Sequence, residues 1–401
     1  MLRIRVGDLK LGREEKEIIN EVLDSGRLSE GAKVKAFEAK WANFIGTKYC
    51  VAVNSGTSAL ITGLFALKHL LKLEDRAKVI TSPLTFIATV NSIVACGLEP
   101  VFADIDKETF AIKADEAEKV IKKEKGIKVI LPVHLMGYPA DMDKINGLAK
   151  KYNLTVVEDA AQAHGTIYKG KKLGSLSSLG CFSFYIAHNV QAGEMGAVVT
   201  DDYRIYQLMK KIKAHGRMCD CSVCTRAQGV CPPLKSYKGT EDFDPRFYHD
   251  MFGFNFKAME FQAALGLVQL KRVEEIIGKR KYNVRYLNIG LESLNEVLAL
   301  PKFSEDISYL AYPLVIKRPE IISRMVLRQK LEKAGIETRP LFGCIPTQQP
   351  AYKHLKEKYS GKLPNADYIG LNGFYIGCHQ YLTQEDLDYI IETFKGILKG
   401  A

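Results

Sequence analysis

The sequence predicts an α/β protein with a large, mostly parallel sheet and a smaller α/β domain at its C-terminal end. Short β-rich runs alternate with amphipathic helical segments from about residue 54 to residue 160, which is the rhythm of parallel strands joined by helices. Polar residues such as Asp159 follow these runs, at the strand ends where such sheets bind ligands. From about residue 283 the pattern becomes a mixture of α and β, which indicates a separate small domain.

Helical spacing of apolar residues predicts two helices first, over residues 14–24 and 33–44. The alternating part then follows. Its strands are expected at 78–82, 100–103, 129–134 and 155–158, and its helices at 54–71, 86–96 and 142–151. A long loop is expected at 216–250, a long helix at 253–278 and a last helix at 385–398. We therefore expect a large domain over 1–275, with a cysteine-rich insertion at about 215–250, and a small domain over 276–401.

Composition is that of an ordinary globular enzyme, with 401 residues, 47% of them hydrophobic and 26% charged. No run of 18 apolar residues is present, so no membrane partner and a cytoplasmic location are expected. The net charge is +11, but the lysines are spread along the chain, so we expect no nucleic-acid partner. A nucleotide diphosphate substrate is compatible with this charge.

Small hydroxyl residues open one expected helix, in the run Asn54-Ser-Gly-Thr-Ser-Ala-Leu60. A helix N-terminus presents free N–H groups and favours an anion, so this turn is a candidate phosphate site. Serine and threonine at such positions are also common simple caps. Phe86 opens the next helix and could either stack on an aromatic cofactor or lie in the core. Asp159 ends a strand and could either pair with a cofactor or cap a helix.

Five motifs, in order, resemble the DegT/DnrJ-type sugar aminotransferases, which use pyridoxal phosphate (PLP). They are Asn-Ser-Gly-Thr-Ser-Ala-Leu, Thr-Phe-Ile-Ala-Thr, Glu-Asp-Ala-Ala-Gln-Ala-His-Gly, Phe-Ser-Phe-Tyr and Gly-Phe-Asn-Phe-Lys, within residues 25–275. The resemblance implies an aspartate-aminotransferase-like PLP fold and a homodimer. It implies these cofactor contacts: Gly56, Thr57, Ser58 and Ser183 to the phosphate, Phe86 to the ring face, Asp159 to the ring nitrogen, Gln162 to the ring hydroxyl, and Asn255 to the phosphate bound by the neighbouring subunit.

His188 stands where this family has the lysine that binds the cofactor covalently. Imidazole cannot make that bond, but it can take and give a proton near neutral pH. This departure resembles the sugar 3-dehydratase branch, and the stretches 335–342, 348–352 and 373–377 resemble that branch as well. Within the first stretch, Arg339 could contact a substrate or a loop carboxylate. A degenerate aminotransferase kept for regulation or structure is the alternative.

Four of the nine cysteines crowd into the expected loop. They are Cys219, Cys221, Cys224 and Cys231, and in a reducing compartment such a cluster favours a metal over disulfides. Gly216-Arg-Met-Cys219-Asp-Cys221 is similar to the iron–sulfur dehydrases of the branch, in which a Cys-x-Cys pair and a downstream cysteine help to hold a [2Fe–2S] cluster. The position that carries their remaining cysteine is Ala161 here, so Cys224 is the candidate fourth ligand. A [4Fe–4S] cluster, zinc and free thiols stay open.

The resemblance implies an enzyme that uses pyridoxamine phosphate (PMP) and removes the C3 hydroxyl of a nucleotide-linked 4-keto-6-deoxyhexose. His188 would move the proton, and a reductase or ferredoxin would supply electrons through the cluster. One alternative is a 3-dehydratase that needs no cluster and regenerates PMP with glutamate. Another is a non-catalytic PLP- or sugar-binding regulator.

Overall fold

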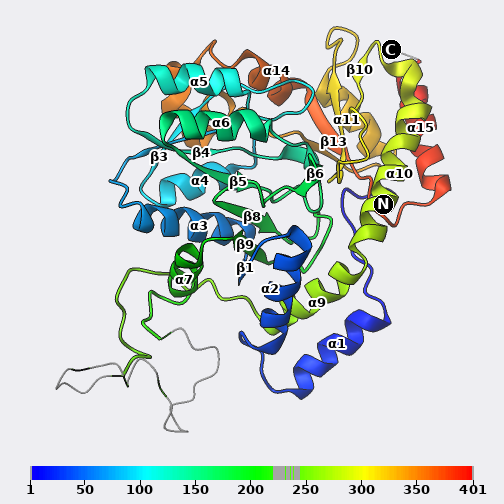
Figure 1. Cartoon of the computed structure of the whole chain (residues 1–401). Coiled ribbons are helices and arrows are strands. Elements are labelled where there is room, and N and C mark those ends of the chain that lie inside the picture. Colours follow the sequence, from blue (N-terminus) through cyan, green and yellow to red (C-terminus); the bar gives the residue numbers. More distant parts are fainter. Residues whose placement is uncertain (1, 220–230, 232–234, 236–237, 239–243, 400–401) are drawn as a thin grey trace.

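A seven-stranded sheet forms the centre of the computed structural model, which describes residues 2–219, 231, 235, 238 and 244–399 (Figure 1). The strand order is β1-β9-β8-β5-β4-β2-β3. Its strands are β1 (Tyr49–Val53), β2 (Lys78–Thr81), β3 (Glu99–Phe102), β4 (Ile127–Leu131), β5 (Thr155–Asp159), β8 (Leu179–Ser183) and β9 (Gly196–Thr200). Only β9 runs antiparallel to its neighbours in this sheet. The expected mostly parallel sheet is confirmed.

Helices cover both faces of this sheet (Figure 1). One face carries α3 (Gly56–Leu70), α4 (Ile87–Ala95) and α7 (Tyr203–Ile212), and the other carries α2 (Ala32–Ile45), α5 (Ala114–Lys123) and α6 (Met142–Tyr152). Along β1 the side chains alternate between two cores, because successive strand residues point to opposite faces. Val51 and Val53 lie in the core on the α3 side, and Cys50 and Ala52 in the core on the α2 side.

The helix α2 shows how the sequence specifies one of these layers. Phe37, Trp41 and Ile45 recur every four residues and are buried, so one face of the helix packs on the sheet. The Trp41 ring lies edge-on to Phe182 and Phe184 at centroid distances of 5.1 and 4.7 Å. The helix ends at Gly46, which takes the left-handed conformation (φ 91°) that glycine adopts without strain.

A four-stranded antiparallel sheet, in the order β10-β11-β13-β12, forms the small α/β part. Its strands are β10 (Leu298–Ala299), β11 (Tyr312–Ile316), β12 (Thr338–Pro340) and β13 (Gly373–Ile376), with helices α11 (Arg324–Lys333), α14 (Pro364–Asn372) and α15 (Gln384–Leu398). The N-terminal residues join it, because Ile4 forms a parallel bridge with Ile336 and the Val6 N–H donates to the Glu337 carboxylate at 2.8 Å. The domain boundary at residue 275 stays a prediction.

Several expected boundaries moved, and one expected helix was wrong. Residues 253–278 do not form one helix: α9 (Glu260–Lys271) and α10 (Val273–Leu291) meet at Arg272, whose ψ of 9° interrupts the helical path. The preceding residues are extended, and Phe256 accepts a hydrogen bond from the Asn54 N–H at 2.8 Å. The strand expected at 129–134 ends at Leu131, because Pro132 has no N–H for the sheet.

The remaining elements are α1 (Arg13–Asp24), the hairpin β6 (Ile167–Tyr168) and β7 (Lys171–Lys172), α12 (Ile345–Gln348), α13 (Lys356–Tyr359), and the 3-10 turns η1 (Leu135–Gly137), η3 (Glu292–Leu294) and η4 (Pro350–Leu355). Helix α1 confirms the first expected helix. Helix α15 confirms the last expected helix and begins one residue earlier than expected. Within the described part of the chain, none of the helices is both long and apolar enough to cross a bilayer.

Candidate active site

The site residues converge on the edge of the sheet where β1, β2, β5 and β8 all end. These strands run in one direction, because β1 and β8 are each antiparallel to β9 and the others are parallel to β8 or to its neighbours. Gly56 follows β1, Phe86 follows β2, and Asp159 and Ser183 are the last residues of β5 and β8. Such an edge is where open α/β sheets bind ligands.

The first turn of α3 forms a small cradle. Ser55 caps the helix, accepting a hydrogen bond from the Ser58 N–H at 3.1 Å, and its Oγ lies 2.9 Å from the Ser58 Oγ. A Cβ on Gly56 would lie 2.5 Å from the Ser183 Cβ, so only glycine allows the helix to approach β8 this closely. The first-turn N–H groups of a helix have no partner within it. Together with the hydroxyls, they give the turn the donors that a phosphate needs.

Asp159 is buried, with 4% of its surface exposed. Its Oδ2 accepts a hydrogen bond from the Thr89 hydroxyl at 2.7 Å, and its Oδ1 accepts one from the Ala161 N–H at 3.2 Å. Burial raises the pKa of this carboxyl, and the two donors oppose that rise. Sequence reasoning missed Thr89, although the Thr-Phe-Ile-Ala-Thr motif places it one helical turn after Thr85.

The strand end is braced from behind by a second buried carboxylate. Glu158 is fully buried and accepts hydrogen bonds from the His134 Nε2 at 3.0 Å, from the Gly174 N–H at 2.7 Å and from the Leu176 N–H at 2.8 Å. On the next loop, the Gln162 Oε1 accepts the Met136 N–H at 2.9 Å, which leaves its amide nitrogen to donate. These contacts fix the backbone that carries Asp159 and Gln162.

His188 lies on the loop after β8, with 9% of its surface exposed. Its backbone N–H donates to the Tyr185 carbonyl at 2.8 Å, and the centroid of its ring lies 5.9 Å from that of the His164 ring. Its Nδ1 is buried and has no hydrogen-bond partner among the described residues. Burial, followed by the positive charge of Arg280, lowers the pKa of His188 to about 3. The imidazole is therefore neutral at pH 7 and able to accept a proton.

Two candidate residues line the side that faces the small sheet. Phe86 is 56% exposed, and its ring lies 5.9 Å from that of Phe342. Arg339, on β12, donates to the Glu337 carboxylate at 3.0 and 3.2 Å and lies close enough to Tyr185 to interact with it electrostatically. The carboxylate partner of Arg339 is therefore Glu337, two residues earlier in the chain. The Arg339 side chain also lies beside the loop that carries His188.

Asn255 is not drawn into this site. Its side chain is exposed, and its Oδ1 accepts a hydrogen bond from the Lys257 Nζ at 2.5 Å. Among the described residues, no hydrogen bond joins it to the other cofactor candidates. An exposed position agrees with a contact across a subunit interface, which stays a prediction.

The cysteine candidates are only partly described. Cys219 is half-buried and Cys231 is buried, whereas Cys221 and Cys224 lie outside the described residues. The described cysteines form no disulfide. No group of three or more histidine, cysteine, aspartate or glutamate side chains suited to a metal occurs among the residues described. The four-cysteine site therefore stays a prediction.

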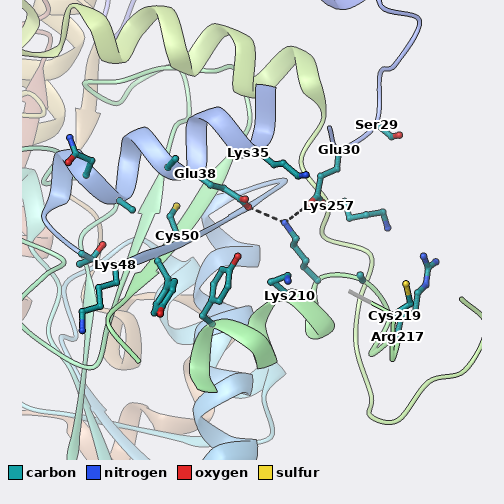
Figure 2. Close-up of a pocket in the computed structure, with 18 of the residues that line it drawn as sticks. Ser29, Glu30, Lys35, Glu38, Lys48, Cys50, Lys210, Arg217, Cys219 and Lys257 are labelled. Carbon is teal, nitrogen blue, oxygen red and sulfur yellow. Dashed lines mark hydrogen bonds and ion pairs between the residues drawn. The ribbon is translucent and has the colours of Figure 1, made fainter. Parts of the chain in front are cut away.

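A basic groove with a cavity of about 710 Å³ runs along the edge strand β1, between α2 and α7 (Figure 2). On its floor, the buried Lys213 ammonium lies 2.9 Å from Glu30 and 3.2 Å from Glu38. Lys213 and Glu38 also bond the carbonyl and N–H of Ala52, at 3.1 and 2.8 Å. The lining includes Cys219 but none of the cofactor candidates. The contacts of Lys213 and Glu38 to Ala52 occupy backbone groups that the edge strand β1 would otherwise leave unpaired.

Three known proteins are similar to this chain over almost all of its length. Lipopolysaccharide biosynthesis protein RfbH of Salmonella typhimurium is 35% identical over 393 residues, which cover 96% of this chain and 89% of that protein. PseC of Helicobacter pylori, an aminotransferase of pseudoaminic acid biosynthesis, matches with a TM-score of 0.87 and 26% identity over 99% of this chain and 100% of its own. The E. coli GDP-4-keto-6-deoxy-D-mannose 3-dehydratase, solved with hydrated PLP, matches with a TM-score of 0.86 and 27% identity over 98% of this chain and 99% of its own.

These structural matches confirm the expected aminotransferase-like fold. They also show that one fold serves an aminotransferase and a 3-dehydratase, so the fold alone does not choose between the two reactions. The family is decided by a sequence model that matches residues 10–395. This chain belongs to the DegT/DnrJ/EryC1/StrS aminotransferase family.

Proposed function

We propose that this protein is a PLP- and PMP-dependent enzyme that removes the C3 hydroxyl of a nucleotide-linked 4-keto-6-deoxyhexose. Membership of the family supports a PLP-dependent enzyme that modifies sugars. The single observation that carries the finer proposal is His188, a neutral buried imidazole in the place of the family's lysine. An aminotransferase of this family needs that lysine, whereas a dehydratase needs a base that is not attached to the cofactor.

The residues present fit the cofactor. The cradle of Gly56, Thr57, Ser58 and Ser183 would hold the phosphate, and Phe86 would cover one face of the ring. Asp159 would pair with the ring nitrogen, and the Gln162 amide would donate to the ring hydroxyl. When bound, PMP supplies an amine for the sugar ketone and an electron sink for the elimination.

His188 would act on protons through its imidazole ring. The neutral ring carries one nitrogen without a proton, which could take a proton from bound reactant. Once protonated, the imidazole could deliver the proton to the departing C3 hydroxyl, which leaves as water. Because the charged form is disfavoured by burial and by Arg280, the imidazolium is a strong acid. Arg339 would contact the substrate from the small-sheet side.

A turnover assay tests the proposal. Purified protein is mixed with PMP and a panel of nucleotide-linked 4-keto-6-deoxyhexoses, with a one-electron reductant in one arm and glutamate in another to supply the two electrons that the reaction needs. It is expected to release a 3-deoxy sugar product, detected by mass spectrometry as the loss of one oxygen. Formation of a 4-amino sugar from PLP and glutamate would contradict the dehydratase assignment in favour of an aminotransferase. Failure to convert any sugar of the panel, with PLP bound, would favour the non-catalytic regulator.

The spacing of Cys219, Cys221, Cys224 and Cys231 favours an iron–sulfur cluster as the source of electrons, with a reductase or ferredoxin as the partner. Four thiolates within 13 residues suit iron in a reducing cell. The competing candidate is a cluster-free 3-dehydratase that regenerates PMP with glutamate. It draws support from the structural likeness to the E. coli 3-dehydratase.

Metal analysis separates these candidates. Anaerobically purified protein is expected to contain iron and acid-labile sulfide, and Cys219→Ser should bleach the visible absorption and remove most reductive turnover. Cys96→Ser, a change at a buried thiol that bonds the Ile61 carbonyl at 3.6 Å, is the control and should keep the colour. Zinc without iron, or full turnover with glutamate and no reductant, would contradict the cluster.

A further inference from the structure

A chain of two hydroxyls leads to the Asp159 carboxylate. The Thr89 Oγ1 lies 2.7 Å from the Asp159 Oδ2, and the Thr85 Oγ1 lies 2.8 Å from the Thr89 Oγ1. An ionised carboxylate can only accept hydrogen bonds, so the single hydroxyl proton of Thr89 is donated to Asp159. Thr85 must then be the donor to Thr89. The chain therefore has one direction, from Thr85 through Thr89 to the carboxylate.

This chain of hydroxyls and the carboxylate at its end are shielded from water. Thr85, Thr89 and Asp159 expose 3%, 1% and 4% of their surfaces. Thr89 lies in the first turn of α4 and its N–H reaches the Phe86 carbonyl at 3.2 Å. The turn that presents Phe86 therefore also supplies the Thr89 hydroxyl. The start of α4 thus positions both Phe86, the candidate contact to the ring face, and Asp159, the candidate partner of the ring nitrogen.

We propose that Thr89 is a positioning residue that keeps Asp159 ionised and aimed at a protonated pyridine nitrogen, with Thr85 fixing the direction of the Thr89 hydroxyl. This inference rests on the proposed function, because the pyridine nitrogen belongs to the cofactor proposed above. Thr89 occupies one side of Oδ2 and the Ala161 N–H occupies Oδ1. These two bonds fix the plane of the carboxylate while leaving it able to accept a third donor.

The physical reason is competition for one proton. In a dry site, a carboxylate and a pyridine nitrogen share a proton according to their relative basicities. Burial raises the pKa of Asp159, which favours transfer of the proton to the carboxylate. The Thr89 hydroxyl stabilises the anion and opposes that transfer. Without it, the proton is expected to move toward Asp159 and the ring nitrogen to become neutral, which weakens the cofactor as an electron sink.

The test uses PMP labelled with ¹⁵N in the ring, because the ¹⁵N chemical shift reports protonation of that nitrogen independently of turnover. In Thr89→Val, the pH at which the nitrogen loses its proton should fall by about one unit and PMP should bind about tenfold more weakly. Thr89→Ser should restore both. The matched control is Thr81→Val: Thr81 is equally buried, but its hydroxyl donates to the Leu131 carbonyl at 2.8 Å, and its loss should leave the ¹⁵N shift unchanged.

The outcomes distinguish a failure of this inference from a failure of the proposed function. A wild-type protein that binds no PMP would remove the proposed function and this role with it. If the wild type binds PMP and Thr89→Val keeps its ¹⁵N titration, the role of Thr89 is refuted while the proposed function stands. Should Thr89→Val fail to fold, Thr85→Val leaves the Thr89 hydroxyl in place. A smaller shift in the same direction is then expected, and a wild-type titration would refute the proposal.

Discussion

Replacing His188 by asparagine is expected to lower the rate of C3 dehydration by roughly 10³-fold, while PMP binds with unchanged affinity. A positioned acid–base group contributes about 10²–10⁴-fold to a rate, and asparagine keeps a polar side chain in the loop without a titratable nitrogen. Single-turnover kinetics with preloaded PMP measures the chemical step, and equilibrium dialysis measures the affinity. Activity within a factor of a few of the wild type would remove His188 from the mechanism.

The pH dependence offers an independent check on the same residue. Burial and Arg280 lower the pKa of His188 to about 3, so the base form is fully present above that pH and is lost only below it. The acid limb of kcat/KM, which reports the free enzyme, should therefore lie below about pH 5. A limb with its midpoint near 6.5, the value of an unperturbed histidine, would contradict the shielded imidazole.

His188→Lys provides the matched gain of function. If position 188 is the family's covalent attachment point, a lysine there should bind PLP as an imine. Borohydride reduction of the PLP-loaded protein should then fix the cofactor to the chain in this variant and not in the wild type. Mass spectrometry of the peptide that carries position 188 detects the added mass. Covalent cofactor at another lysine in the wild type would mean that the anchoring position had been misassigned.

A shared active site predicts that two inactive variants rescue one another. Asn255→Ala should weaken cofactor binding by about one to two orders of magnitude, because a lost hydrogen bond to a charged group costs about 1.5–3 kcal/mol. Asp159→Ala should remove the partner of the ring nitrogen. In a heterodimer of the two variants, both defects fall in one site and the other site is whole.

The measurement is activity after subunit exchange, with differently tagged variants and purification through both tags. At a cofactor concentration that saturates the wild type but not Asn255→Ala, about half of the wild-type activity per dimer is expected, against little for either variant alone. Two differently tagged Asp159→Ala subunits serve as the control and should gain nothing on exchange. A purified heterodimer without activity would show that Asn255 does not complete the partner's site.

The sequence predicted the sheet and its covering helices because buried strands and amphipathic helices carry distinct periodicities. It failed at residues 253–259, where Phe254 and Phe256 pack and pair as an extended segment that helical spacing also fits. Short strands such as β6 carry too few residues for any pattern. In the site, motif residues at strand ends were found together, because strand ends converge. Thr89, His134 and Glu158 were missed, because they act through another residue and their partners are distant in sequence.

The N-terminal pairing has a consequence for synthesis of the chain. The Val6 N–H finds its acceptor, Glu337, 331 positions later. At about 5–20 residues per second, Val6 is synthesised roughly 15 to 65 s before Glu337. Co-translational folding of the small sheet therefore cannot finish until Glu337 and the strands around it have been made. A ribosome stalled before it adds Glu337 should hold a nascent chain in which the segment around Val6 is still open to proteases.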